Sequence, residues 1–311
     1  MYALTPRCHL SSLPRFSPAC RVVTTSRPPP LPPPPAVSVA TTSSSQFGGP
    51  ADPSSLRSTW PHRAWVATGS ATVIASLVKS VSVAAACGAA VEPLLGAVLG
   101  YLLADLGTGV YHWAIDNYGG PSTPVFGAQI EGFQGHHKYP YTITRREFAN
   151  NLHALARAVT FTVPPIQFLI SASQFKLAEN GIFHFQGISI GDGSMAAAAH
   201  AFVGVCAGCI MLSQQFHAWA HEKKGRLPPA VAALQEAGVL VSRAEHAAHH
   251  RPPYNSNYCI VSGACNRALD ESRVFEAMEM VVFFRFGVRP RSWSEPASER
   301  KEQTARIAGK D

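Results

Sequence analysis

The residues best suited to chemistry in this chain are its histidines, because their spacing is ordered. His217 and His221 are four residues apart, which places both imidazoles on one face of a helix. Imidazole suits Zn, Fe, Cu and Ni, and a single zinc ion needs about four ligands. Eight imidazoles in paired or tripled positions therefore predict two metal ions, with these candidate ligands: His112, His136, His137, His217, His221, His246, His249 and His250.

The histidine groups stand near the ends of apolar runs, which predicts where they meet. His112 lies late in one run, and His217 and His221 end another. Because polar groups at membrane depth are costly unless they serve a function, we expect the ligands to meet at one membrane face. Asp105 and Asp116 share a helical face with His112, so either carboxylate can orient an imidazole from behind. An interfacial polar face explains the two aspartates equally well.

The composition predicts an all-α integral membrane protein. Charged residues make up 14% of the chain and hydrophobic residues 46%, whereas a soluble domain carries about 25% charged residues. Spanning the hydrocarbon takes about 20 apolar residues. We expect about four membrane helices, in segments 64–90, 94–115, 152–175 and 194–219. Pro164 and Pro165 should kink or split the third, or make it a re-entrant pair.

Three other segments carry weaker signals. Segments 228–241 and 274–286 are suited to lie in the membrane plane as helices. Segment 181–193 alternates apolar residues with glycines, which predicts a short hairpin or a loop. Cys206 and Cys209 form a C-x-x-C inside the fourth membrane segment, where helix packing explains them better than a redox or zinc site does.

The first 63 residues differ in composition from the rest. They hold six arginines, no lysine and one acidic residue, so they carry +5 of the chain's net charge of +7. This Arg-rich, Ser-rich and acid-poor composition predicts a disordered plastid transit peptide over residues 1–63. We expect a membrane domain over 64–290 and a polar tail over 291–311. Because the basic charge lies in the leader, we expect no nucleic-acid partner.

Four segments resemble the Kua family of lipid desaturases, which includes animal plasmanylethanolamine desaturase: DLGTGVYHWAIDNYG, FQGHHKYPYTITRREF, QQFHAWAH and EHAAHHRPPYNSNYCI. The similarity is greatest to the plastid, fatty acid desaturase 4-like branch, and it covers about residues 95–285. The three histidine boxes of the family match His136 and His137, then His217 and His221, then His246, His249 and His250, with His112 upstream.

The resemblance implies an enzyme that places a trans double bond at carbon 3 of palmitoyl chains in phosphatidylglycerol of chloroplast membranes, the thylakoid above all. It implies two iron ions held by the eight histidines, with His153 as a further candidate ligand. An unactivated C–H bond requires an oxidant made from O₂ at the metal, so we assign no catalytic residue beyond the ligands. The sequence has no flavin, haem or iron–sulfur motif, so a separate electron donor is implied, ferredoxin by analogy.

Other functions use the same residues. A di-iron lipid hydroxylase, or a desaturase of another glycerolipid, can share the ligand set, because hydroxylation and desaturation diverge only after the first hydrogen is removed. A zinc protease fits less well, because HAWAH lacks the glutamate of H-E-x-x-H. A histidine-rich membrane metal carrier is the non-enzyme alternative, although it does not require three spaced boxes.

Basic residues flank the boxes: Lys138, Arg145, Arg146, Lys223, Lys224 and Arg251. They can attract an anionic phosphate headgroup. They can also be the flanking charges of cytosol-like or stromal loops, which is the interpretation we favour from the sequence.

Overall fold

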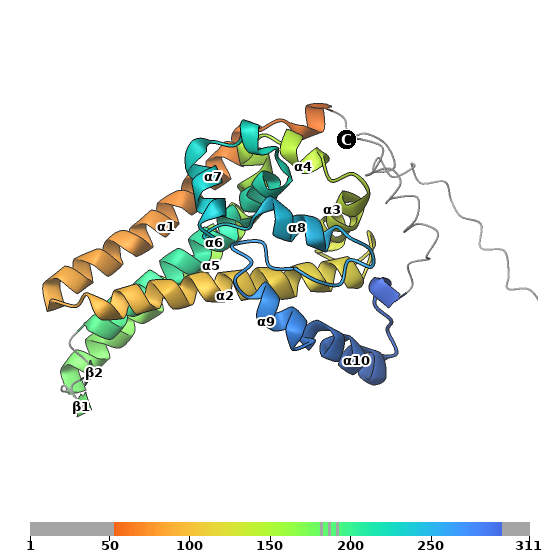
Figure 1. The fold of residues 1–311 in the computed structure, drawn as a ribbon. Coiled ribbons are helices and arrows are strands. Elements are labelled where there is room, and N and C mark those ends of the chain that lie inside the picture. The colour runs from red at the N-terminus through yellow and green to blue at the C-terminus, as the bar shows by residue number, and fades with distance from the viewer. Residues whose placement is uncertain (1–52, 181–182, 186–187, 191–192, 294–311) are drawn as a thin grey trace, which may run out of the picture. The chain divides into compact units, whose positions relative to one another are not determined.

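The computed structural model describes residues 53–180, 183–185, 188–190 and 193–293, and helices dominate it (Figure 1). Its four longest helices are those that the sequence assigns to the membrane: α1 Trp60–Cys87, α2 Val91–Asn117, α5 Phe148–Asn180 and α6 Ser194–His221. By length and composition, four helices can cross a bilayer within the described residues, and they match these four. The predicted all-α membrane fold is confirmed.

Helix α1 begins inside the stretch predicted as a leader. Thr59 and His62 form a capping box, in which each side chain bonds the other residue's backbone N–H. Just upstream, the Asn150 side-chain amide donates to the carbonyls of Ser55 and Arg57 at 3.0 and 2.9 Å. The expected boundary at residue 63 therefore falls within the folded unit. Residues 1–52, which hold most of the predicted leader, lie outside the described residues.

Helices α2 and α6 approach each other closely through glycine. A Cβ atom at Gly96 would lie 2.3 Å from the carbonyl oxygen of Ala198, and one at Gly100 would lie 2.5 Å from that of Phe202. Small residues four apart permit such backbone contact between membrane helices. This packing fixes the two helices against each other, and both carry predicted ligands in their C-terminal turns.

Helix α5 runs unbroken through Pro164 and Pro165. The expectation of a split helix or a re-entrant pair was wrong. Proline removes backbone N–H donors, but membrane helices tolerate it where neighbouring helices and hydroxyl side chains compensate. Helix α5 packs along α1, where the Thr68 and Thr160 hydroxyls lie 3.2 Å apart.

Shorter elements link the long helices: η1 Pro53–Leu56, α3 Gly127–Lys138, α4 Thr142–Arg145, β1 Phe183–Phe185, β2 Ile188–Ile190, η2 Lys224–Arg226, α7 Pro229–Glu236, α8 Arg243–His249, α9 Asn266–Glu271, α10 Val274–Phe286 and η3 Arg291–Trp293. The strands β1 and β2 pair antiparallel, as the hairpin expected in segment 181–193. Helix α10 fills its expected segment. Helix α7 is shorter than expected, because the chain turns at Gly238, whose φ is +69°.

The predicted polar tail begins on the folded unit. The Trp293 indole N–H donates to Glu279 at 2.8 Å, and the Ser292 backbone N–H donates to Asn117 at 3.2 Å. Residues 294–311 lie outside the described residues.

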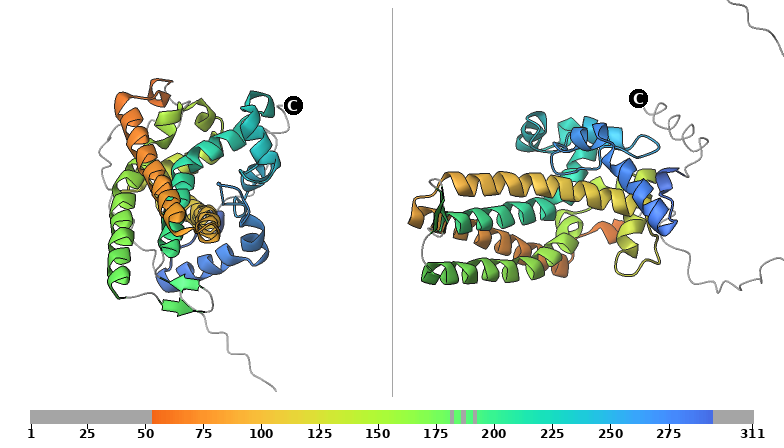
Figure 2. Two further views of the ribbon diagram at one scale, coloured as in Figure 1. Left: turned by 90° about the vertical axis from the view of Figure 1, so that its left-hand side faces the viewer. Right: turned by 90° about the horizontal axis from the view of Figure 1, so that it is seen from below.

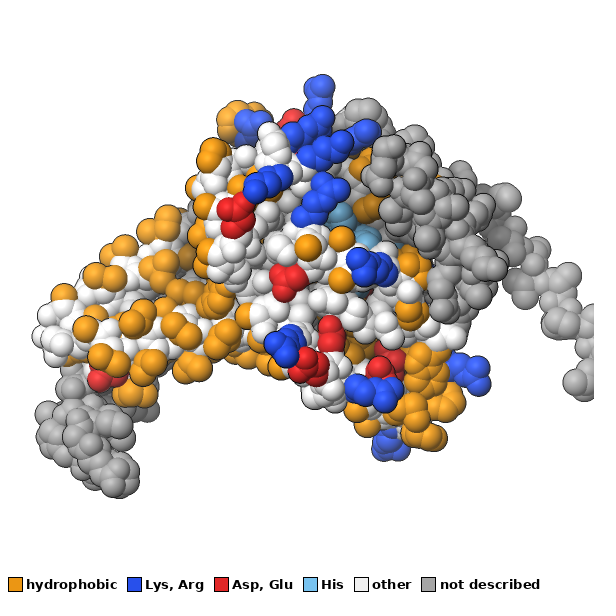
Figure 3. Space-filling view, in the orientation of Figure 1, with side chains coloured by type: hydrophobic (Ala, Val, Ile, Leu, Met, Phe, Trp, Pro, Cys, Tyr) orange, Lys and Arg blue, Asp and Glu red, His pale blue; other side chains and the backbone are white. Residues whose placement is uncertain are grey.

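The surface divides into an apolar and a charged part. Exposed apolar side chains cover the long helices, including Ile74, Val78, Val81, Leu94, Leu95, Val98, Leu99, Phe161, Phe168 and Leu169. Figure 3 shows this apolar surface along α1 and α2, whereas the charged side chains gather around α7 to α10. The long helices lie side by side, with α3, α4, α7 and α8 toward one end and the hairpin at the other (Figures 1 and 2). The charged end is therefore the one outside the hydrocarbon.

Candidate metal centre

Four helices end at one place, and each brings histidines to it. Helix α2 contributes His112, α3 contributes His136 and His137, α6 contributes His217 and His221, and α8 with its C-cap contributes His246, His249 and His250. The backbone carbonyls at helix C-termini carry partial negative charge, which favours a nearby cation. The structure thus brings all eight predicted ligands together in an environment suited to positive ions.

Five histidines form a first cluster, the imidazole group: His136, His217, His221, His246 and His250. One ligand nitrogen from each lies within 4.8 Å of all the others. Nε2 of His221 is 2.8 Å from Nε2 of His136 and of His246, and 3.3 Å from that of His217. Nitrogen atoms this close can direct their lone pairs toward one shared cation.

Three histidines and a carboxylate form the second cluster, the aspartate group: His112, Asp116, His137 and His249. Oδ2 of Asp116 lies 3.1 Å from Nε2 of His137, 3.2 Å from that of His112 and 3.3 Å from that of His249. The sequence placed Asp116 behind the ligands, whereas the structure places it among them. The sequence placed Asp116 on the helical face of His112, four residues away, but spacing alone does not distinguish a carboxylate among the ligands from one behind them.

Backbone carbonyls orient two imidazoles of the aspartate group. Nδ1 of His112 donates to the Tyr258 carbonyl at 2.9 Å, and Nδ1 of His249 donates to the Ser256 carbonyl at 2.8 Å. A carbonyl only accepts, so the proton of each neutral ring is on Nδ1 and the Nε2 lone pair faces the cluster. Such outer hydrogen bonds are typical of metal-bound histidine.

Unsatisfied polar atoms show that the residues fit a metal. Within the described residues, both carboxylate oxygens of Asp116 and Nε2 of His112 are buried without a hydrogen-bond partner. A buried carboxylate without compensation is costly, and a bound cation removes that cost. Three imidazoles and one carboxylate, beside five imidazoles, suit a borderline transition metal.

Asp105 binds the backbone of a loop beside the centre. Its Oδ1 accepts from the backbone N–H groups of Ser262 and Gly263 at 2.8 and 3.0 Å, and its Oδ2 accepts from that of Cys265 at 3.0 Å. Within the part of the chain that the structure describes, no imidazole forms a hydrogen bond with it. It instead anchors to α2 the loop whose Tyr258 carbonyl fixes His112, so Asp105 positions the centre through the backbone.

His153 lies outside both groups. Its ring stacks on His62 at a centroid distance of 3.9 Å, and its Nδ1 donates to the Asn150 carbonyl at 2.8 Å. The structure therefore leaves the ninth candidate ligand away from the centre. Cys206 and Cys209 also lie elsewhere, packed against the apolar core around Ala104 and Phe216.

Burial keeps the loop and short-helix imidazoles neutral. Burial, together with the neighbouring His112 and His137, lowers the pKa of His249 to about 4, although Asp116 opposes this shift. Burial likewise lowers the pKa of His136, His246 and His250 well below the ordinary histidine value. Neutral imidazole is the form that binds metal, so these residues are ready to coordinate at physiological pH.

Aromatic rings surround the aspartate group. The Tyr254 ring lies 4.5 Å from that of His137, the Phe133 ring 5.2 Å from that of His112, and the Tyr258 ring 5.0 Å from that of His249, between centroids. Tyr258 also packs with Trp113 and Phe275 in an apolar cluster that Met278 and Val282 of α10 adjoin. These rings keep water away from the aspartate group.

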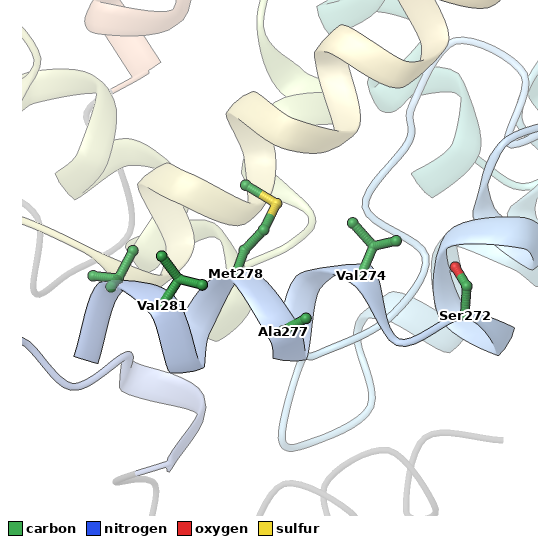
Figure 4. Close-up of a pocket in the computed structure, with 6 residues that line it drawn as sticks. Ser272, Val274, Ala277, Met278 and Val281 are labelled. Atoms are coloured by element: carbon green, nitrogen blue, oxygen red, sulfur yellow. The ribbon is translucent and has the colours of Figure 1, made fainter. Parts of the chain in front are cut away.

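An apolar groove follows α10 on the surface beside this cluster (Figure 4). Its volume is about 380 Å³, and it is lined by Ser272, Val274, Ala277, Met278, Val281 and Val282. Hydrocarbon is the chemical class that such a lining accommodates. Met278 and Val282 connect the groove to the cluster that contains Tyr258.

The lipid desaturase domain matches residues 101–293, so this chain belongs to the lipid desaturase family. The match includes all nine residues of the two groups. The chain is therefore an oxidoreductase that acts on a lipid, and an enzyme of this class uses O₂. The resemblance seen in the histidine boxes is confirmed.

Individual relatives sharpen this assignment. The chain is 57% identical over 246 residues to fatty acid desaturase 4, chloroplastic, of Arabidopsis thaliana, covering 79% of this chain and 69% of the relative. It is 54% identical over 253 residues to fatty acid desaturase 4-like 1, chloroplastic, of the same plant, covering 81% and 77%. Plasmanylethanolamine desaturase of Myxococcus xanthus is 32% identical over 206 residues, covering 64% and 63%.

No solved structure matches this chain. The chloroplastic relatives and the four membrane helices together support a chloroplast membrane protein.

Proposed function

We propose that this chain is a di-iron desaturase that introduces a trans double bond at carbon 3 of palmitoyl chains in phosphatidylglycerol, in the thylakoid membrane. One observation carries the proposal: the lipid desaturase domain contains two adjoining ligand groups at the end of a membrane-helix bundle. The similarity to fatty acid desaturase 4, chloroplastic, supports a desaturase of fatty acyl chains in the chloroplast. The lipid and the position are those that the resemblance of the histidine boxes implies.

The residues of each group would hold one iron ion. Bound iron supplies the O₂ chemistry that removal of hydrogen from an unactivated chain requires. The residues of the chain position the ligands around the iron ions. Asp116 would offset part of the positive charge in the aspartate group, while the carbonyls of Tyr258 and Ser256 hold two imidazoles in the ligating tautomer.

The substrate would reach the centre from the membrane. The groove along α10 is apolar, and Met278 links it to the rings of Trp113 and Tyr258. Carbon 3 lies close to the ester end of an acyl chain, so the headgroup would remain near the charged end of the bundle. An external one-electron donor would supply two electrons, and ferredoxin is the proposed carrier.

We also propose that a plastid transit peptide within residues 1–63 delivers the membrane domain of residues 64–290, with a polar tail over 291–311. The contacts of Ser55 and Arg57 with α5 favour cleavage upstream of Pro53, since cleavage after Arg57 would remove these contacts and cleavage after Thr59 would also remove the cap of α1. N-terminal sequencing of the protein imported into isolated chloroplasts tests this placement.

Lipid analysis by headgroup class tests the reaction. The full chain is expressed in a plant line that lacks its own trans-3 desaturase, beside a His249→Ala variant at the same protein level. We expect trans-3 palmitate confined to phosphatidylglycerol with the wild type and none with the variant. A hydroxylated chain, or an altered chain in another glycerolipid, would contradict the proposed reaction or substrate.

A further inference from the structure

The metal centre reaches the surface through two imidazoles. Of the nine candidate ligands, only His221 and His250 are partly exposed, and both belong to the imidazole group. The four residues of the aspartate group are all buried. Histidine is visible at the surface beside α8 in Figure 3. This edge is therefore the shortest way for electrons to pass from outside the protein to the ligands.

Four exposed cations surround this edge, and we call them the cationic rim: Lys138, Lys223, Arg243 and Arg251. Each lies within three residues of a candidate ligand. The ligands themselves converge within a few ångströms, so their neighbours in sequence also gather around the centre. Figure 3 shows Lys and Arg side chains collected around the visible histidine.

The members of the rim have no counter-charge, unlike the neighbouring cations Lys224 and Arg226. Lys224 pairs with Glu236 at 2.5 Å, and Arg226 lies 4.0 Å from Glu222. Among the described residues, no carboxylate forms an ion pair with any member of the rim. An uncompensated patch of one sign attracts a partner of the opposite sign and speeds its association.

We propose that the cationic rim is the docking surface for an acidic, soluble one-electron carrier protein, and this inference rests on the proposed desaturase function. In each turnover, two hydrogen atoms leave the acyl chain. Those hydrogens, with two electrons from the carrier and two protons from water, reduce one O₂ to two water molecules. Two successive dockings of a one-electron carrier supply the two electrons.

The position of the rim favours a protein over a lipid headgroup. Lys223 follows the end of α6. Arg243 begins α8 and Arg251 follows it, and α8 is not among the helices able to cross a bilayer. The rim thus lies beyond the apolar helix surfaces and over the exposed imidazole edges. A headgroup site would instead be expected where cations adjoin those apolar surfaces.

Charge reversal tests the docking surface with a matched control. The iron-loaded full-length enzyme is placed in nanodiscs that contain phosphatidylglycerol, and an acidic [2Fe–2S] carrier, kept reduced, is varied in concentration. The test variant is Lys223→Glu with Arg251→Glu. The control is Arg267→Glu with Arg273→Glu, which changes net charge equally at cations that already pair with Glu271 and Glu276.

We expect the rim variant to raise the KM for the carrier by about tenfold, with little change at the control pair. Raising the ionic strength from about 20 to about 300 mM should raise the KM of the wild type and barely affect the rim variant. A carrier whose acidic surface is reversed to lysine should restore the variant.

A second measurement supplies the electrons chemically, so that product formation no longer depends on docking of the carrier. Enzyme reduced chemically without oxygen and then exposed to O₂ should form equal product in the wild type and the rim variant. If the rim variant left the KM for the carrier unchanged, the docking proposal would be overturned. A raised KM for phosphatidylglycerol with an unchanged KM for the carrier would point to a headgroup site instead. No product from prereduced wild type would overturn the desaturase function itself, and the docking proposal with it.

Discussion

The aspartate group and the imidazole group adjoin each other, yet different forces hold their rings. In the aspartate group, the carbonyls of Tyr258 and Ser256 fix two imidazoles. In the imidazole group, Nδ1 of His217 and of His246 have no hydrogen-bond partner within the described residues. The fold therefore prepares the aspartate group in advance, whereas the imidazole group relies on the metal to order its rings.

Removing a ligand from either group should have the largest effect. We expect His136→Ala, His217→Ala and His249→Ala each to lower product formation by more than about 100-fold, because losing only an outer partner of a ligand costs 10- to 100-fold. Lipid analysis at matched protein level measures the loss. His153→Ala is the control, since its ring lies outside both groups. Retained activity in all three ligand variants would contradict the assignment.

Asp116→Asn should separate the two groups. The amide keeps the shape of the side chain but loses the charge that faces three imidazoles. We expect a loss of about half the bound iron and about 100-fold lower activity, measured by elemental analysis and product formation. Full iron content with normal activity would return Asp116 to the outer role that the sequence suggested.

Asp105→Asn should have a smaller effect on chemistry and a clear effect on stability. An amide NH₂ would face one or more of the three backbone N–H groups that now bind the carboxylate. Leaving a buried donor unpaired costs about 1–3 kcal/mol. We expect a lower melting temperature in detergent and activity reduced by about tenfold with iron retained. Iron loss equal to that of Asp116→Asn would show direct ligation instead.

The joint change Cys206→Ser and Cys209→Ser should have the smallest effect. Both side chains pack against an apolar cluster, away from the two ligand groups. We expect activity within about twofold of the wild type, because the substitution nearly conserves volume. A large loss at normal protein level would instead indicate a redox role.

Sequence patterns predicted the positions of the helices and the candidate histidine ligands, but not the contacts between segments that are distant in sequence. Helical spacing and the apolar runs predicted α1, α2, α6 and the meeting of the boxes at one end. The continuity of α5 through Pro164 could not be predicted, because it depends on neighbouring helices. The anchoring role of Asp105 depends on a loop more than 150 residues away in sequence, which spacing within one helix cannot reveal.

Counting iron in the purified full-length protein tests the central claim most directly. The protein is reconstituted with ferrous iron without oxygen, and its iron content is measured beside its Mössbauer spectrum. We expect two iron ions per chain in two distinguishable environments, one containing a carboxylate, and about one in Asp116→Asn. A maximum of one ion in the wild type, or two identical sites unaffected by that substitution, would contradict the two-group centre.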